Sequence, residues 1–280
     1  MDFIYSGFAD EASPEFPKQV AALKRNGYSH IELRNVDGKK LTELTQSQAH
    51  EMKKLMDDNG IRVWSMGSPI GKIKMDDCWQ THLDDCRRVL DLAGIFGATR
   101  LRMFSFYMPK DQTPALHKSW VFDRMAELLE VISRWDIVPC HENEKGIYGD
   151  LAPRCVELHQ AFPQLKAVFD PANFVQCGQE TLEGWDMLAP YVDYMHIKDA
   201  LPNGRVVPAG QGQGNVQAII RKYAARGGKV LSLEPHLTKF IGLQNLESEP
   251  VSHIGALHFD NADQAFDHAA KTLYGLVEAL

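Results

Sequence analysis

The chain of 280 residues carries a formal net charge of −7, and its 44% hydrophobic and 24% charged residues are ordinary for a globular protein. A mildly acidic protein lacks the broad positive field that binds nucleic acid or an anionic membrane, so neither partner is expected. Five cysteines without a C-x-x-C pair, an N-terminus without a signal pattern and no apolar run near ~20 residues predict a cytoplasmic protein with reduced thiols.

Short β-branched or aromatic runs alternate with longer helical patterns along the whole chain. In chain order, the predicted strands cover residues 3–8, 28–33, 61–65, 99–104, 137–142, 165–170, 192–198 and 230–234. The predicted helices cover about 14–26, 45–59, 77–96, 113–135, a segment from 153, and then 181–188, 216–226 and 262–280.

Three helix starts carry capping signals. Ser13 is expected as an N-cap with Pro14 in the first turn, where a missing N–H costs nothing. Thr45 with Gln48 forms a capping box, and Asn261 with Gln264 repeats the pattern before the last helix.

Eight strands alternating with eight helices favour a closed parallel sheet, a (β/α)8 TIM barrel in which residues 1–280 form a single domain. An open doubly wound sheet is the competing fold. The first strand–helix turn, residues 8–13, has no glycine-rich phosphate fingerprint, which argues against the open sheet.

Polar side chains end four consecutive late strands: Glu142, Asp170, His196 and Glu234. Each alone could be an ordinary strand-end residue. In a barrel, however, strand ends meet at one face, and a buried carboxylate cluster without a cation would repel itself. Three carboxylates and one imidazole suit a hard divalent metal, with Mn²⁺ expected first and Mg²⁺, Co²⁺ or Zn²⁺ as alternatives.

Such a site suggests chemistry next to a carbonyl. The cation would act as a Lewis acid toward a developing enediolate, while Glu142 and Glu234 remove and return a proton. Return to the other face gives epimerisation, and return to the neighbouring carbon gives aldose–ketose isomerisation. Loss of a β-hydroxyl instead would make the protein a dehydratase or lyase. A non-catalytic sugar-binding module is a third hypothesis.

Short motifs at these strand ends are recognisable. H-E-N-E (141–144), F-D-P-A-N (169–173), M-H-I-K-D-A (195–200) and L-E-P-H (233–236) resemble the sugar phosphate isomerase/epimerase family of xylose isomerase-like barrels, as do residues 7–11 and 67–73. The resemblance implies a small sugar substrate and four metal ligands, with the two glutamates as the acid–base pair. The ligands are Glu142, Asp170, His196 and Glu234.

Departures from that family narrow the substrate. Ketohexose 3-epimerases carry a substrate-binding His where this chain has Asn173, and an Arg where it has Pro202; Arg205 is a possible substitute. An inosose, a keto-sugar derivative and a phosphorylated sugar stay open. The apurinic-endonuclease relatives carry extra histidines on strands three and four. Residues 64–67 and 101–104 have none, so a DNA-repair function is not expected.

Further side chains are candidates for substrate binding, each with a structural alternative. Lys198 should point the same way as His196, or pair with Asp199 or Glu234. Glu32 could bind sugar hydroxyls or form a salt bridge with Arg34 or Arg102. The full set of predicted substrate-binding residues is Lys198, His236, Glu32, Arg205 and Lys72.

Two loops stand out, one for its glycine content and one for its length. Residues 208–214 are glycine-rich without the Lys and Ser/Thr of a nucleotide-binding loop, and are expected to form a flexible loop at the site mouth. Residues 237–259 are long enough for a lid or a subunit contact, so a homo-oligomer is possible.

Overall fold

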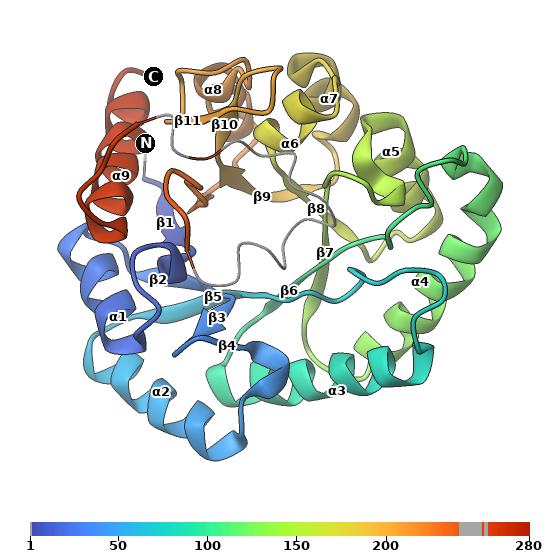
Figure 1. Cartoon of the computed structure of the whole chain (residues 1–280), viewed down its shortest axis with the longest axis horizontal. Coiled ribbons are helices and arrows are strands. Elements are labelled where there is room, and N and C mark those ends of the chain that lie inside the picture. The colour runs from blue at the N-terminus through green and yellow to red at the C-terminus, as the bar shows by residue number, and fades with distance from the viewer. Residues whose placement is uncertain (1, 241–253, 255–256) are drawn as a thin grey trace.

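Eight parallel strands form one nearly closed barrel in this computed structural model, which describes residues 2–240, 254 and 257–280 (Figure 1). The strand order is β1-β12-β9-β8-β7-β6-β5-β2, and the end strands β1 and β2 lie beside each other without a ladder between them. The strands are β1 (Ile4–Gly7), β2 (His30–Leu33), β5 (Arg62–Gly67), β6 (Arg100–Met103), β7 (Val138–Glu142), β8 (Lys166–Phe169), β9 (Val192–Ile197) and β12 (Val230–Leu233). The predicted TIM barrel is confirmed.

Helices surround this sheet on its outer side (Figure 1). They are α1 (Phe16–Arg25), α2 (Gln46–Asp58), α3 (Trp79–Phe96), α4 (Lys118–Ile132), α5 (Ala152–Ala161), α6 (Pro171–Gln176), α7 (Thr181–Leu188), α8 (Val216–Ala225) and α9 (Ala262–Glu278). Two short antiparallel pairs follow strand ends, namely β3 (Asn35–Val36) with β4 (Lys39–Lys40) and β10 (Asp199–Ala200) with β11 (Val206–Val207). Strands of two residues are too short to leave a periodic pattern in the sequence.

Two of the three predicted helix caps are confirmed. The Thr45 hydroxyl accepts the N–H of Gln48 at 3.2 Å, and the Asn261 side chain accepts that of Gln264 at 2.9 Å. The Ser13 cap is wrong, because a 3₁₀ turn over Ala9–Glu11 comes first and α1 begins later, with Glu15 as its N-cap. Ser13 instead accepts the N–H of Glu15, within the turn that leads into the helix.

The interior of the barrel changes character along its axis. Cys140, Val168, Tyr194 and Val230 form a small apolar cluster inside the sheet, separate from the large core between sheet and helices. Buried charged groups such as Glu142 lie at the carboxyl ends of the strands instead. The apolar cluster therefore forms an apolar floor inside the barrel. The polar carboxyl end of the strands above it is the barrel mouth.

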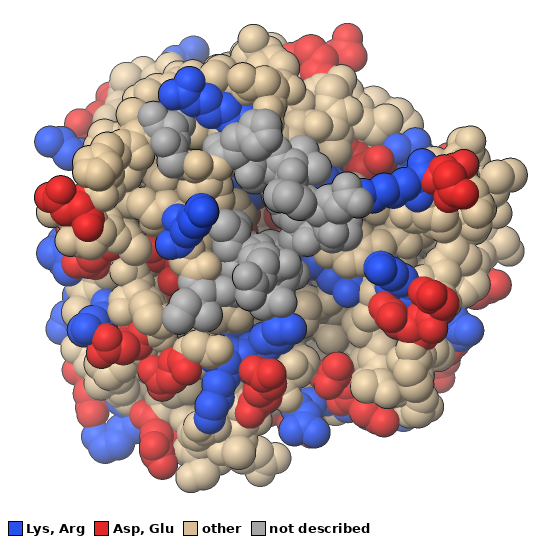
Figure 2. Space-filling view, in the orientation of Figure 1, with Lys and Arg blue, Asp and Glu red and all other residues tan. Residues whose placement is uncertain are grey.

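Lysines and arginines are interspersed with acidic residues over the face shown in Figure 2, with no broad patch of one sign. Within the described ranges, no helix combines the length and apolar character needed to cross a bilayer. Most of the predicted lid or subunit-contact segment, residues 241–253 and 255–256, lies outside the described residues.

Candidate metal centre

Four buried side chains converge at the carboxyl ends of the late strands. Glu142 ends β7, Asp170 follows β8, His196 lies on β9 and Glu234 follows β12. One ligand atom from each lies within 4.8 Å of all the others. Parallel strands in register deliver these residues at one height, as a barrel requires.

Asp170 is fixed by the start of α6. It is the N-cap of that helix, and its Oδ1 accepts the N–H of Asn173 at 2.9 Å. The Asn173 amide then donates to Oε1 of Glu142 at 3.2 Å, which ties two predicted ligands together. Burial raises the pKa of Asp170 to about 6; Lys198 opposes this rise, and the carboxylates Glu142 and Glu234 add to it.

His196 presents its two ring nitrogens to different partners. Nδ1 lies 3.1 Å from Glu142 Oε1 and 3.5 Å from Glu234 Oε2, whereas Nε2 lies 3.1 Å from Glu32 Oε2. Burial alone lowers the pKa of His196, but the Glu142 and Glu32 carboxylates raise it well above its ordinary value. With Nε2–H donated to Glu32, Nδ1 is the nitrogen available to a cation.

Glu32 lies inside the barrel behind His196, next to the apolar floor. Its Oε1 accepts the Tyr194 hydroxyl at 2.7 Å, and its Oε2 accepts the Ser232 hydroxyl at 2.7 Å. The structural partners considered from the sequence, Arg34 and Arg102, pair with other carboxylates. Burial raises the pKa of Glu32, but His196 outweighs it and the pKa ends below its ordinary value.

Glu234 is held by two buried cations. Arg34 Nη1 donates to its Oε1 at 2.8 Å, and Lys198 Nζ donates to its Oε2 at 3.0 Å. Burial raises the pKa of Glu234, but Lys198 and the neighbouring histidines bring it well below its ordinary value. Arg34 also binds Asp10 at 2.9 Å and Glu11 at 3.1 Å, so one guanidinium serves three carboxylates.

Lys198 bridges two predicted ligands, because its Nζ lies 2.9 Å from Asp170 Oδ2 and 3.0 Å from Glu234 Oε2. The expected pairing with Glu234 is thus present, and Asp170 is a second partner that the sequence did not suggest. The other expected partner, Asp199, faces the glycine-rich loop and accepts the N–H groups of Gly210, Gly212 and Gly214.

These hydrogen bonds correct the expectation of a flexible loop at residues 208–214. Side chains at Gly212 and Gly214 would collide with the Asp199 carboxylate, so glycine is needed for the backbone to approach it. The loop is held to the barrel end by one carboxylate.

The remaining predicted contacts lie at different depths. His236 is buried, with Nε2 3.4 Å from Glu11 and 3.5 Å from Glu234, and burial lowers its pKa well below the ordinary value. Lys72 reaches Glu144 at 2.8 Å with only 5% of its side chain exposed. Arg205 is exposed on the connection between β10 and β11, in contrast to the buried ligands.

The residues present fit a divalent cation. Glu142 Oε2 and Asp170 Oδ2 are buried and accept no hydrogen bond from the described residues, although a cation lies within ion-pairing distance of each. Carboxylates outnumber basic side chains in the connected network. Its carboxylates are Asp10, Glu11, Glu32, Glu142, Asp170 and Glu234, and its basic side chains are Arg34, Arg102, Lys198, His196 and His236. These carboxylate oxygens and His196 Nδ1, which faces Glu142 and Glu234, are suitable ligands for a divalent metal.

The sequence argument did not assign three of the residues that hold this centre. Arg34 binds Glu234, Arg102 lies 3.2 Å from Glu142, and Asn173 binds Glu142 and Asp170. Asn173 could have been found, because Asp170-Pro171 is a helix-start signal that places the third following N–H on the carboxylate. Arg34 and Arg102 have no comparable local signal.

A barrel with a buried carboxylate–imidazole ligand set at its carboxyl face defines a class of metal-site proteins. Residues 20–265 match the sequence profile described as xylose isomerase-like TIM barrel, and the chain belongs to that family. No curated protein sequence matches the chain significantly.

Solved structures similar to this chain include proteins with different described activities. One is the IolI protein with a zinc atom (15% identity, TM-score 0.77, 98% of each chain covered). A second is the probable 3-DHS dehydratase AsbF from Bacillus anthracis (17% identity, TM-score 0.75, 98% of this chain and 99% of that chain). A third is D-psicose 3-epimerase in the presence of D-fructose (13% identity, TM-score 0.72, 98% and 99%). At identities this low, the structural similarity establishes only the shared barrel, and the printed activities, an epimerase and a probable dehydratase, belong to those proteins.

Proposed function

We propose that this protein is a divalent-metal-dependent isomerase or epimerase of a keto-sugar or sugar derivative. The observation that carries the proposal is the convergence of Glu142, Asp170, His196 and Glu234, whose ligand atoms lie within 4.8 Å of one another. Glu142, Asp170, His196 and Glu234 would hold the metal, and Mn²⁺ is the first ion to test. When bound, the cation supplies a Lewis acid to the oxygens of the substrate.

Proton transfer is assigned to Glu142 and Glu234. They come from β7 and from the end of β12, and β8 and β9 lie between these two strands in the sheet. A substrate carbon held between them can lose its proton to one carboxylate and regain one from the other. Arg34 and Lys198, both bonded to Glu234, keep that carboxylate ionised and therefore able to accept the proton.

The surrounding residues position these groups. Glu32 receives Nε2–H of His196 and so orients the imidazole, and Asn173 fixes Glu142 relative to Asp170. Lys198, His236 and Lys72 are proposed substrate contacts at the mouth, and Arg205 is a further candidate on the β10–β11 connection.

Incubation of metal-loaded protein with a panel of keto-sugars and inososes in D2O tests the proposal by mass spectrometry. We expect one solvent deuteron in the product with no other change in mass, and turnover that follows the content of added metal. Loss of water would identify a dehydratase instead. Sugar binding without deuterium exchange or loss of water would indicate a non-catalytic sugar-binding module.

Glu142→Gln and Glu234→Gln sharpen the test. Each should lower kcat at saturating metal by a factor on the order of 10²–10⁴, because a proton-transfer group is lost. Glu183→Gln, an exposed change on α7, is the matched control and should have no effect. Metal content and circular dichroism separate this loss from failed metal binding or folding, and full activity in either variant contradicts the assigned roles.

A further inference from the structure

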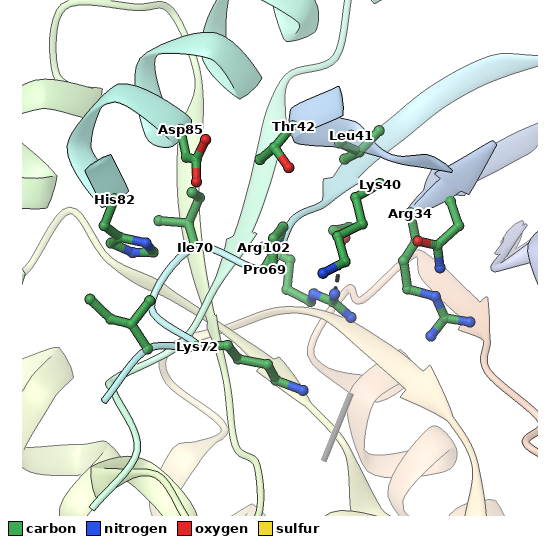
Figure 3. A pocket seen from close by; sticks show the side chains of 13 residues that line it. Arg34, Lys40, Leu41, Thr42, Pro69, Ile70, Lys72, His82, Asp85 and Arg102 are labelled. Atoms are coloured by element: carbon green, nitrogen blue, oxygen red, sulfur yellow. Dashed lines mark hydrogen bonds between the residues drawn. The ribbon is translucent and has the colours of Figure 1, made fainter. Parts of the chain in front are cut away.

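A pocket of about 260 Å³ lies on the early-strand side of the barrel mouth (Figure 3). Figure 3 shows Lys40, Lys72 and Arg102 reaching toward one region from separate segments of the chain, with Arg34 at its edge. Asp85 is the one carboxylate among the thirteen residues that line the pocket. The wall of the pocket is therefore basic, although the protein as a whole is acidic.

Two residues that line the pocket, Arg102 and Arg34, also contact predicted ligands of the metal centre. Arg102 Nη1 lies 3.2 Å from Glu142 Oε2, and Arg34 Nη1 lies 2.8 Å from Glu234 Oε1. A substrate held between these two glutamates would therefore lie next to arginines that also line the pocket. A substituent on the side of these arginines would point toward the basic wall.

Two of the basic groups, Arg102 and Lys40, are not fully occupied by contacts with other described residues. Arg102 donates through Nη2 to the Gly67 and Ser68 carbonyls, but its buried Nε has no hydrogen-bond partner among the described residues. The exposed Lys40 on β4 forms no ion pair within the described part of the chain. The exposed Lys40 is therefore the group that can form a charge-assisted hydrogen bond with an anion, and the buried Arg102 adds positive charge beside it.

We propose that this pocket binds an anionic substituent, a carboxylate or a phosphate, so that the substrate is an acidic sugar derivative rather than a neutral sugar. Lys40 meets the anion, and Arg102, Lys72 and Arg34 contribute charge while paired to their own carboxylates. The inference rests on the proposed function for the reacting end of the substrate. The anion site itself rests on the pocket.

Isothermal titration of the metal-loaded protein with three related probes tests the inference. D-fructose is neutral, 5-keto-D-gluconate carries a carboxylate, and D-fructose 6-phosphate carries a phosphate. We expect at least one acid to bind on the order of tenfold or more tightly than D-fructose, since charge-assisted hydrogen bonds are added. Whichever acid binds more tightly identifies the substituent, and its affinity should fall with added salt.

Paired substitutions locate the binding to this pocket. Lys40→Ala should weaken the preferred acid by about fivefold, as expected for an exposed ion pair. Lys39→Ala is the control, because adjacent residues of a strand point to opposite faces and only Lys40 lines the pocket. Asp85→Asn should tighten the acid by removing the single repulsive carboxylate. None of the three should change D-fructose binding.

The inference is overturned if neither acid binds more tightly than D-fructose, or if Lys39→Ala and Lys40→Ala have equal effects. These outcomes are distinct from failure of the proposed function. Deuterium exchange into D-fructose without a preference for acids would support the proposed isomerase activity and contradict the proposed anion site. Binding of an acid that depends on Lys40, without any deuterium exchange, would support the anion site and contradict the proposed isomerase activity.

Discussion

The two halves of the barrel mouth differ in charge. The late strands, β7, β8, β9 and β12, deliver the three carboxylates and the imidazole of the candidate metal centre. On the early side, Arg34 follows β2, Lys72 lies in the loop after β5, and Arg102 lies on β6. The comparison teaches that Glu142 and Glu234 can be buried because Arg102 and Arg34 of the early half face them. Lys198, which follows late strand β9, completes the balance at Asp170.

Arg34 tests this charge balance most severely. Arg34→Met should lower the free energy of unfolding of the metal-free protein by about 3–5 kcal/mol, because three buried carboxylates lose their shared partner. Urea unfolding measures the change.

The control is Arg25→Met, which breaks exposed ion pairs with Asp263 and Asp267. Exposed pairs contribute about 0–1 kcal/mol, so this variant should unfold almost as the parent does. Equal losses in the two variants would show that the basic half does not compensate the acidic one.

The same contrast explains what the sequence could predict. Glu142, Asp170, His196 and Glu234 were identifiable because each ends a strand, and a barrel brings strand ends together. Arg34 and Arg102 were not assigned a role, because their burial depends on partners that lie far away along the chain. Arg34, for example, binds Asp10 and Glu234, which are separated from it by 24 and 200 residues.

Element boundaries show a similar division. The capping box at Thr45 is local chemistry and was predicted, whereas the 3₁₀ turn at Ala9–Glu11 displaced the expected cap at Ser13. The glycine-rich loop appeared flexible because nothing near it in sequence revealed that Asp199 would accept three of its N–H groups. Contacts made by folding, rather than propensity, decided these regions.

Glu32 links the two halves, since it lies on early strand β2 and contacts His196 on late strand β9. Glu32→Gln should weaken divalent-metal binding by about 10–100-fold, the usual effect of losing the carboxylate behind a ligating histidine. Titration calorimetry with Mn²⁺ measures it. Tyr194→Phe removes one hydrogen bond to Glu32 but keeps the carboxylate, so its effect should be smaller.

A purely structural role for Glu32 would have a different signature. Glu32→Gln would then lower the urea midpoint while binding Mn²⁺ as tightly as the parent protein. Tighter binding in Glu32→Gln than in Tyr194→Phe would contradict the orienting role directly.

His82 gives the early half its own response to pH. It lies on α3 in the wall of the basic pocket, and its Nε2 accepts the N–H of Gly71 at 2.9 Å. Gly71 has φ of +88°, and a side chain there would collide with the Phe104 backbone, so this turn depends on glycine and on its acceptor. Burial lowers the pKa of His82 to about 4.

A histidine whose pKa is lowered by folding stabilises the folded state above its ordinary pKa, and this contribution is lost as pH falls toward the folded value. Between pH 7 and pH 5, His82 should therefore cost on the order of 1–2 kcal/mol of unfolding free energy. His82→Gln, which keeps an acceptor but cannot titrate, should flatten the dependence by that amount in urea unfolding at the two pH values. His50→Gln, an exposed change on α2, should leave the slope unchanged. An identical slope in His82→Gln and the parent would place the acid sensitivity elsewhere, and the early half would then contribute charge to the mouth without a pH response of its own.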